Sequence, residues 1–216
     1  MRKHNLTTGQ TYHIFSRSIA GYVIFNSDGE YSRMLDVFEY YVNERPSLSI
    51  SRYLALSDEA QRERLEMDKN SERLVDIIAY CIMPTHIHLV LKQLKDKGIV
   101  LYMKNILNSY SRYFNTKHIR KGPLWEGRFK SVLIEKQEYL QHLTRYVHLN
   151  PVTSKLTENP SNWKYSSYNE YLNDDPEKLC RYADMLEIDA QQYKTFVEDR
   201  IAYQQELHQI KSMLLE

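Results

Sequence analysis

Residues 82–92, Ile-Met-Pro-Thr-His-Ile-His-Leu-Val-Leu-Lys, hold the pattern that decides the fold. From His86 onward the run is β-branched and apolar, and it follows a proline, which predicts a strand entered from a turn. Side chains alternate between the two faces of a strand, so His86 and His88 should point to one side and Ile87 to the core. Two imidazoles side by side can bind one divalent cation. Two ordinary, partly buried histidines explain so short a motif about equally well.

The segments around this strand predict the fold class. Further strand patterns cover residues 11–18, 74–82 and 128–135, and helical spacing covers residues 30–45, 98–117 and 137–149. Asn150-Pro151 should end the last of these helices. The order strand–helix–strand–strand–helix–strand is the ferredoxin-like split βαβ pattern. We therefore predict an α+β protein, with a four-stranded antiparallel sheet, helices on one face and a helical C-terminal extension.

Two regions fall outside this core pattern. Residues 47–73 carry many charges and few large apolar side chains, which predicts an inserted, partly helical excursion. Residues 156–216 form the predicted extension, with an aromatic cluster and helical periodicity near residues 191–214. The predicted domain therefore spans residues 1–155, including the excursion.

Composition limits the class of protein. No apolar run approaches the roughly 20 residues of a membrane span, and no apolar segment follows the N-terminus as in a secretory signal. Cys81 and Cys180 are far apart and form neither a disulfide framework nor a zinc motif. These features predict a protein of the reducing cytoplasm.

Charge is unevenly distributed, although the net charge is only +1. Residues 101–130 contain one acid, Glu126, and seven basic residues: Lys104, Arg112, Lys117, Arg120, Lys121, Arg128 and Lys130. Residues 167–216 hold more acids than bases. The basic segment predicts a local surface for a polyanion, although a solvated helix face would look the same.

A second informative pair lies on the helix at residues 137–149. Tyr146 and Asn150 are four residues apart and share one helix face if the last turn is intact. A tyrosine hydroxyl can act as a nucleophile, and an amide oxygen is a hard ligand suited to Mg²⁺ or Mn²⁺. By itself, however, Tyr146 is better explained as a structural tyrosine on an amphipathic helix.

Several blocks together resemble a family. The sequence resembles the HUH-type single-tyrosine transposases, and among them the REP-associated tyrosine transposases. The resemblance covers about residues 10–170 and rests on these blocks: Tyr12-His13-Ile14 with Arg17, residues 83–90 (Met-Pro-Thr-His-Ile-His-Leu-Val), 111–115 (Ser-Arg-Tyr-Phe-Asn), 122–131 (Gly-Pro-Leu-Trp-Glu-Gly-Arg-Phe-Lys-Ser), Tyr139-Leu140 and 145–152 (Arg-Tyr-Val-His-Leu-Asn-Pro-Val). The His-x-His element is weak alone, whereas the ordered set is specific.

The resemblance implies a site and a reaction. A ferredoxin-like nuclease would act on single-stranded DNA with hairpin, REP-like elements, and would hold Mg²⁺ or Mn²⁺ on His86 and His88. Tyr146 would be the nucleophile that keeps the 5′ phosphate as a phosphotyrosine, and Asn150 the third metal ligand. The REP-associated branch is expected to work as a monomer, whereas dimers occur in the wider family.

The DNA-binding candidates come from the basic segment. They are Arg112, Arg120, Lys121, Arg128 and Lys130, with Trp125 as a residue that could stack a base or equally pack in the core. Two other functions stay open: a catalytically inactive, sequence-specific nucleic-acid-binding protein of the same fold, and a metal-dependent hydrolase that uses water. The second is weaker because no carboxylate pair accompanies the histidines.

Overall fold

The computed structural model describes residues 5–44, 48–68, 71–173 and 178–203. Its strands are β1 (Thr11–Arg17), β2 (Val75–Met83), β3 (His86–Gln93) and β4 (Lys130–Ile134). Its α-helices are α1 (Asp28–Tyr40), α2 (Ile50–Tyr53), α3 (Asp58–Asp68), α4 (Gly98–Lys117), α5 (Gln137–Thr153), α6 (Tyr168–Leu172) and α7 (Ala190–Glu198). Short 3-10 turns lie at Ile19–Gly21 and Pro160–Asn162.

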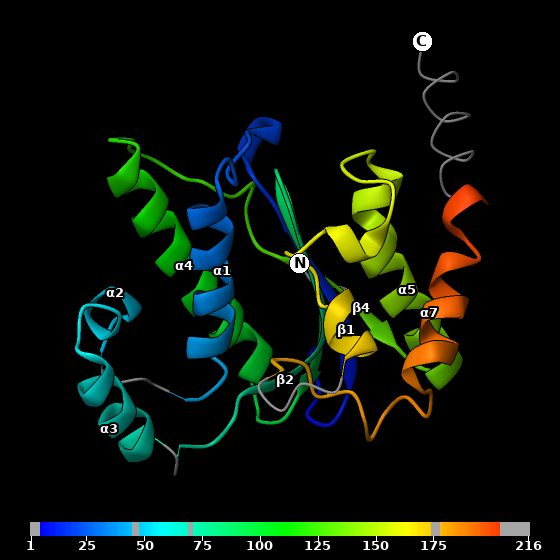
Figure 1. Cartoon of the computed structure of the whole chain (residues 1–216). Coiled ribbons are helices and arrows are strands. Elements are labelled where there is room, and N and C mark those ends of the chain that lie inside the picture. Colours follow the sequence, from blue (N-terminus) through cyan, green and yellow to red (C-terminus); the bar gives the residue numbers. More distant parts are fainter. Residues whose placement is uncertain (1–4, 45–47, 69–70, 174–177, 204–216) are drawn as a thin grey trace.

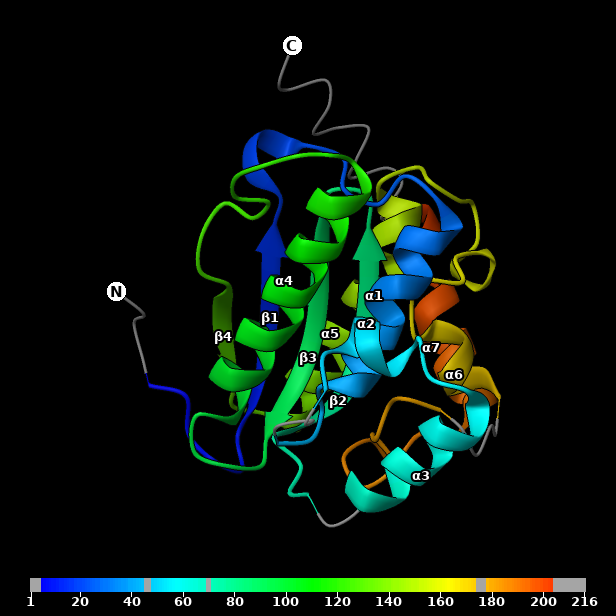
Figure 2. The same cartoon turned by 90° about the vertical axis from the view of Figure 1, so that its left-hand side faces the viewer.

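The strands form one antiparallel sheet in the order β2-β3-β1-β4 (Figure 2). This confirms the predicted ferredoxin-like arrangement, in which α1 connects β1 to the hairpin β2–β3 and α4 connects that hairpin to β4. Helices α1 and α4 cover one face, as expected, whereas α5 lies with α7 on the opposite side, so the sheet is covered by helices on both faces and not on one (Figure 1). Each face therefore has its own core.

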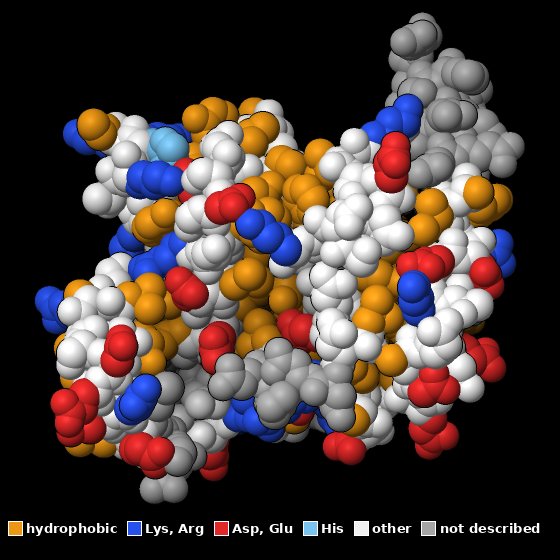
Figure 3. All heavy atoms as spheres, viewed as in Figure 1, with side chains coloured by type: hydrophobic (Ala, Val, Ile, Leu, Met, Phe, Trp, Pro, Cys, Tyr) orange, Lys and Arg blue, Asp and Glu red, His pale blue; other side chains and the backbone are white. Residues whose placement is uncertain are grey.

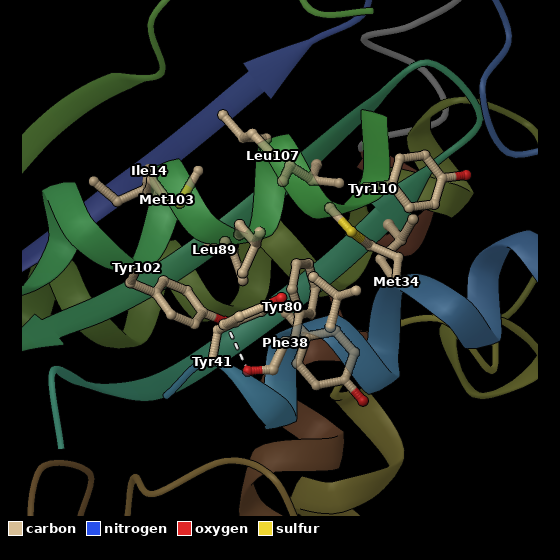
Figure 4. Close-up of a cluster of buried hydrophobic side chains, with 14 of the residues drawn as sticks. Ile14, Met34, Phe38, Tyr41, Tyr80, Leu89, Tyr102, Met103, Leu107 and Tyr110 are labelled. Atoms are coloured by element: carbon tan, nitrogen blue, oxygen red, sulfur yellow. Dashed lines mark hydrogen bonds between the residues drawn. The ribbon is translucent and has the colours of Figure 1, made fainter. Parts of the chain in front are cut away.

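The core under α1 and α4 is rich in tyrosine (Figure 4). Ile14 and Leu89 point from the sheet toward Met103 and Phe38 on the helices, and all four side chains are fully buried. The buried hydroxyl of Tyr102 donates a 3.1 Å hydrogen bond to the Phe38 carbonyl oxygen. Buried tyrosines are tolerated here because their hydroxyl groups find partners within the core.

The described part of the predicted excursion at residues 47–73 contains two helices, α2 and α3, and α2 attaches it to the core. Ile50, the first residue of α2, is 1% exposed and belongs to the main core. The Arg33 guanidinium on α1 donates a 2.7 Å hydrogen bond to the Ser51 hydroxyl. The excursion is therefore attached to the core through α2, while α3 carries most of its charge.

The prediction that Asn150-Pro151 ends the fifth helix is wrong, because α5 continues to Thr153. A proline inside a helix leaves the carbonyl four residues earlier without its amide partner. Here the Asn150 side-chain amide donates to that carbonyl, of Val147, at 3.5 Å, and to the Tyr146 carbonyl at 2.9 Å. The side chain thus replaces the hydrogen bond that Pro151 cannot make.

The C-terminal segment packs on the α5 side of the sheet. Tyr168, Tyr171 and Tyr193 are buried against β2 and α5, and the Tyr171 hydroxyl donates to the Ile78 carbonyl oxygen at 2.7 Å. The predicted helical periodicity at 191–214 begins with α7, and residues 204–214 lie outside the described part of the chain. None of the helices in the described ranges is long and apolar enough to cross a membrane.

Gly98 gives a test of this packing. A Cβ atom at Gly98 would lie 2.2 Å from the Leu74 carbonyl oxygen, which is backbone and cannot rotate away. We expect Gly98→Ala to lower the free energy of unfolding by about 1–3 kcal/mol or more, the usual cost of overpacking. Urea titration followed by circular dichroism measures this change.

Gly29→Ala in α1 is the matched control. A Cβ atom there meets nothing within 4 Å, so the helix preference for alanine should leave stability equal or higher by up to about 1 kcal/mol. Equal effects of the two substitutions would contradict the close approach of α4 to Leu74.

Candidate active site

The pairing of β1 with β3 collects three histidines on the face that α5 covers. In this register Phe15 lies opposite His88, and Arg17 lies opposite His86. Residues opposite each other in an antiparallel pair point to the same face, as do residues two apart on one strand. His13 therefore joins His86 and His88 on this face, diagonal to His88.

Two hydrogen bonds fix these imidazoles. His13 Nε2 lies 2.9 Å from His88 Nδ1, with the two rings stacked and their centroids 5.2 Å apart. His86 Nδ1 lies 3.0 Å from the Thr85 hydroxyl oxygen. In both pairs the Nδ1 atom is engaged, which leaves Nε2 of His86 and of His88 to bind another group.

The environment keeps these histidines neutral. Burial lowers the pKa of His13 to about 4. Burial, helped by the charge of Arg17, lowers the pKa of His86 to about 4. Burial, with smaller contributions from His13, His86 and Arg17, lowers the pKa of His88 to about 2. A metal binds the unprotonated imidazole, so at neutral pH these side chains are in the form that coordinates a cation.

Tyr146 stands over the same histidines. Its ring meets His88 edge-on, with centroids 5.8 Å apart, and His13 edge-on at 6.0 Å. The side chain is 48% exposed, unlike the buried tyrosines of the two cores. Tyr110, on α4, is fully buried and donates to the Ile24 carbonyl oxygen. Tyr146 therefore combines contact with the histidines and access from solvent.

Asn150 lies one helical turn after Tyr146, and the intact last turn of α5 meets the condition for a shared face. It is 9% exposed, and its amide nitrogen is committed to the helix backbone. Its amide oxygen is the atom that a hard cation would need. A role for Asn150 as a ligand stays a prediction.

A divalent cation fits part of this arrangement. Within the described ranges, no group of three or more His, Cys, Asp or Glu side chains could hold a metal ion. His13 cannot supply a third imidazole through Nε2, because that atom contacts His88. A cation held by His86 and His88 therefore needs oxygen ligands, which the Asn150 amide and DNA phosphates could supply.

The DNA-binding candidates are divided over three places. Arg112 is exposed on α4, beside a cavity also lined by Ser51 and Tyr113. Arg120 is tied to its own loop, donating to the Asn115 side chain and to the carbonyl oxygens of Gly122 and Pro123, and exposed Lys121 follows it.

The third place is the β4 edge of the sheet. Arg128 and Lys130 are exposed there, and the Lys130 ammonium lies 5.7 Å from the Phe15 ring centre. Phe15 in turn is 6.1 Å from His88, centre to centre. Of the five predicted basic residues, Lys130 is therefore linked to the histidines through a shared ring. The face shown in Figure 3 has acidic side chains over α3 and no continuous basic surface.

Trp125 packs in the core. The sequence left this role open beside that of a residue that stacks a base. It is 8% exposed, and its indole N–H donates to the Leu107 carbonyl oxygen at 3.2 Å. An open stacking platform would need an exposed ring face, so of the two interpretations the structure favours core packing. The part of the ring that stays accessible lines a hollow beside Arg128.

His13 and Arg17 are site residues that sequence reasoning did not assign. Both lie in the first block of the family resemblance, and their alternation on a strand with Phe15 is visible in the sequence. What the sequence does not give is the register of β1 on β3, which brings His13 to His88. Registers between distant strands depend on the whole sheet.

We expect the histidines to differ in their effect on Mn²⁺ binding, measured by calorimetry with hairpin DNA present. His86→Ala and His88→Ala should abolish binding, because each removes one of the two imidazoles predicted to hold the cation. His13→Ala should weaken binding about 10- to 100-fold, the usual loss when the partner that orients a ligand is removed. His142→Ala, on the exposed part of α5, is the control. Unchanged affinity in His88→Ala would contradict the site.

Comparisons with known proteins point to one family. A family model described as IS200-like transposases matches residues 47–150. A protein of Haemophilus influenzae named as a REP-associated tyrosine transposase is 26% identical over 103 residues, which cover 43% of this chain and 58% of that protein. The chain thus spans little more than half the length of that relative.

A solved structure shows the same fold. It is a REP-associated tyrosine transposase bound to a REP hairpin, and it superposes with a TM-score of 0.53 over 88% of this chain and 94% of the other, at 14% sequence identity. The family model, the curated relative and the fold agree with the blocks quoted from the sequence. The chain is therefore similar to the IS200-like transposases over residues 47–150, and it has the fold of a REP-associated tyrosine transposase.

Proposed function

We propose that this protein cuts and rejoins single-stranded DNA through a covalent bond between Tyr146 and a 5′ phosphate. The observation that carries the proposal is the position of Tyr146, half exposed and edge-on to two neutral histidines of the same chain, the buried His88 and the half-buried His13. The hydroxyl of Tyr146 on the helix can act as a nucleophile, and it lies beside two imidazoles that the sheet holds in fixed positions.

The reaction balances without an external energy source. The Tyr146 hydroxyl oxygen forms a bond to phosphorus, the bond from phosphorus to the 3′ oxygen breaks, and the phenolic proton is given up as the 3′ oxygen takes one. In rejoining, a 3′-OH attacks the phosphotyrosine, and the tyrosine hydroxyl is restored. One phosphodiester is exchanged for another at each step, so no ATP is needed.

The proposed cofactor is Mg²⁺ or Mn²⁺, held by His86, His88 and Asn150. When bound, such a cation withdraws charge from the scissile phosphate and orients it for in-line attack. The role of the His13–His88 contact is to hold the His88 ring in one orientation. We expect activity to disappear when a chelator removes the cation.

The proposed substrate is single-stranded DNA that carries hairpin, REP-like elements. Support comes from the structural relative, which is bound to a REP hairpin, and from the cations at the β4 edge beside the site. Action on DNA would place the protein in the cytoplasm. Since Tyr146 meets histidines of its own chain, we propose that a monomer is sufficient.

A protein that binds hairpin DNA without cutting it is the competing function. It would share the fold and the basic edge but would not need the accessible Tyr146 hydroxyl. A water-using hydrolase would cut DNA but leave no protein attached. The covalent adduct therefore separates all three functions.

We expect Tyr146→Phe to form no covalent adduct with hairpin DNA, while its affinity for the DNA stays within about twofold of the unchanged protein. The phenyl ring keeps its contacts, and only the nucleophile is lost. Denaturing gel electrophoresis of labelled DNA shows the adduct as a band of reduced mobility.

Tyr139→Phe is the control, since Tyr139 lies on the same helix and is 54% exposed. It should form the adduct as the unchanged protein does. An undiminished adduct in Tyr146→Phe would overturn the assignment of the nucleophile, and cleavage without any adduct would favour the water-using hydrolase.

A further inference from the structure

A hollow of about 710 Å³ lies between α4 and the segment that leads into β4. Its walls include the aromatic rings of Trp125 and Phe129, the side chains of Lys104 and Asn108 on α4, and Arg128. The volume falls in the range of pockets that hold drug-sized ligands, a class that includes a nucleotide.

The walls of the hollow are fixed on both sides. Segment 124–126 extends the edge of the sheet, where the Glu126 amide donates to the Arg17 carbonyl oxygen at 2.9 Å and the Ile19 amide donates to the Leu124 carbonyl oxygen at 2.9 Å. The Trp125 indole N–H bonds to the Leu107 carbonyl oxygen on α4. These bonds tie the segment to both the sheet and the helix, so the hollow exists before any ligand arrives.

The chemistry of the lining selects a ligand with a planar apolar part and a negative charge. Two aromatic rings and apolar side chains of α4 form part of the wall, and Lys104 and Arg128 bring positive charge. The Asn108 amide can both donate and accept hydrogen bonds. Among the residues that the structure describes, no aspartate or glutamate lines the hollow. An unpaired base with its phosphates matches this set.

The hollow is also next to the proposed DNA path. Lys130 pairs with Phe15 in the register and points to the face that holds the histidines. Phe129, one residue earlier, points to the α4 face and into the hollow. β4 is the edge strand of the sheet, so a DNA strand leaving Tyr146 past Lys130 can turn over this edge (Figure 2).

We propose that this hollow binds one unpaired nucleotide of the DNA substrate, next to the segment that Tyr146 cuts. The inference rests on the proposed function for its substrate, and it adds a second contact point that would hold the DNA in register for the reaction. Arg128 and Lys104 would neutralise the flanking phosphates, and the base would enter between Asn108 and the accessible parts of the two rings.

The test is abasic scanning of a labelled hairpin oligonucleotide with unpaired flanks, with affinity measured by fluorescence anisotropy in the Tyr146→Phe background. One unpaired position should lose about tenfold in affinity, equivalent to about 1.4 kcal/mol, when its base is removed, because the base then no longer fills the hollow. The Asn108→Trp substitution places a large side chain on the exposed surface of α4, where it fills the hollow. In this variant, removing the base should no longer lower the affinity (the abasic penalty), because the base cannot enter the hollow in the first place.

Charge variants give the second readout. Lys104→Ala should reduce the slope of log affinity against log salt by about 0.7 for a lost single-strand phosphate. Lys194→Ala, exposed on α7, should leave the slope unchanged. Thermal unfolding should show that all three variants keep their fold.

The same abasic penalty with and without Asn108→Trp, or no unpaired position with a penalty, would overturn the proposal. The adduct formed by the unchanged protein reports on the proposed function separately. An adduct with a failed scan removes only the nucleotide site, while a positive scan without any adduct removes only the cutting reaction.

Discussion

The site depends on the pairing of β1 with β3. This register stacks His13 on His88 with 2.9 Å between their nitrogens, and it places Arg17 opposite His86. A shift by one residue would turn His13 to the α4 face and break the contact. The apolar residues of β1 prevent such a shift, because Ile14 is fully buried in the opposite core. The packing of one face of the sheet thus fixes the chemistry of the other.

The helix that carries Tyr146, α5, is held in place by contacts with the C-terminal segment. His148 is fully buried, and its two ring nitrogens lie 2.7 Å from the Tyr193 hydroxyl and 2.7 Å from the Ser167 hydroxyl. Burial lowers the pKa of His148 to about 3, so it stays neutral and can satisfy both partners. The Arg145 guanidinium lies 4.0 Å from the Phe196 ring centre. Residues of the C-terminal segment therefore set the position of α5 over the sheet.

The sequence predicted local features well and long-range ones less so. The helix over 98–117 and the turn before His86 follow from apolar spacing and a proline, and the structure confirms both. One expectation was wrong, because Asn150-Pro151 does not end α5, and of the two interpretations of Trp125 the structure favours core packing. Both outcomes depend on a hydrogen bond from a side chain to a backbone carbonyl, from Asn150 in one case and from Trp125 in the other. Such a bond cannot be predicted from the type of the residue. His13 could not be assigned to the site for a similar reason: its partner, His88, lies on a strand far along the chain, and the pairing of the two strands is not evident from the sequence.

The central claim is that one chain contains the complete site, with Tyr146 acting beside its own histidines. Mixing two inactive variants, His88→Ala and Tyr146→Phe, tests it most directly, with labelled hairpin DNA and a size tag on one chain. If the site is formed within one chain, the mixture forms no adduct, because neither chain has both parts. An adduct on the His88→Ala chain in the mixture would show that Tyr146 works on a partner's histidines and would contradict this account.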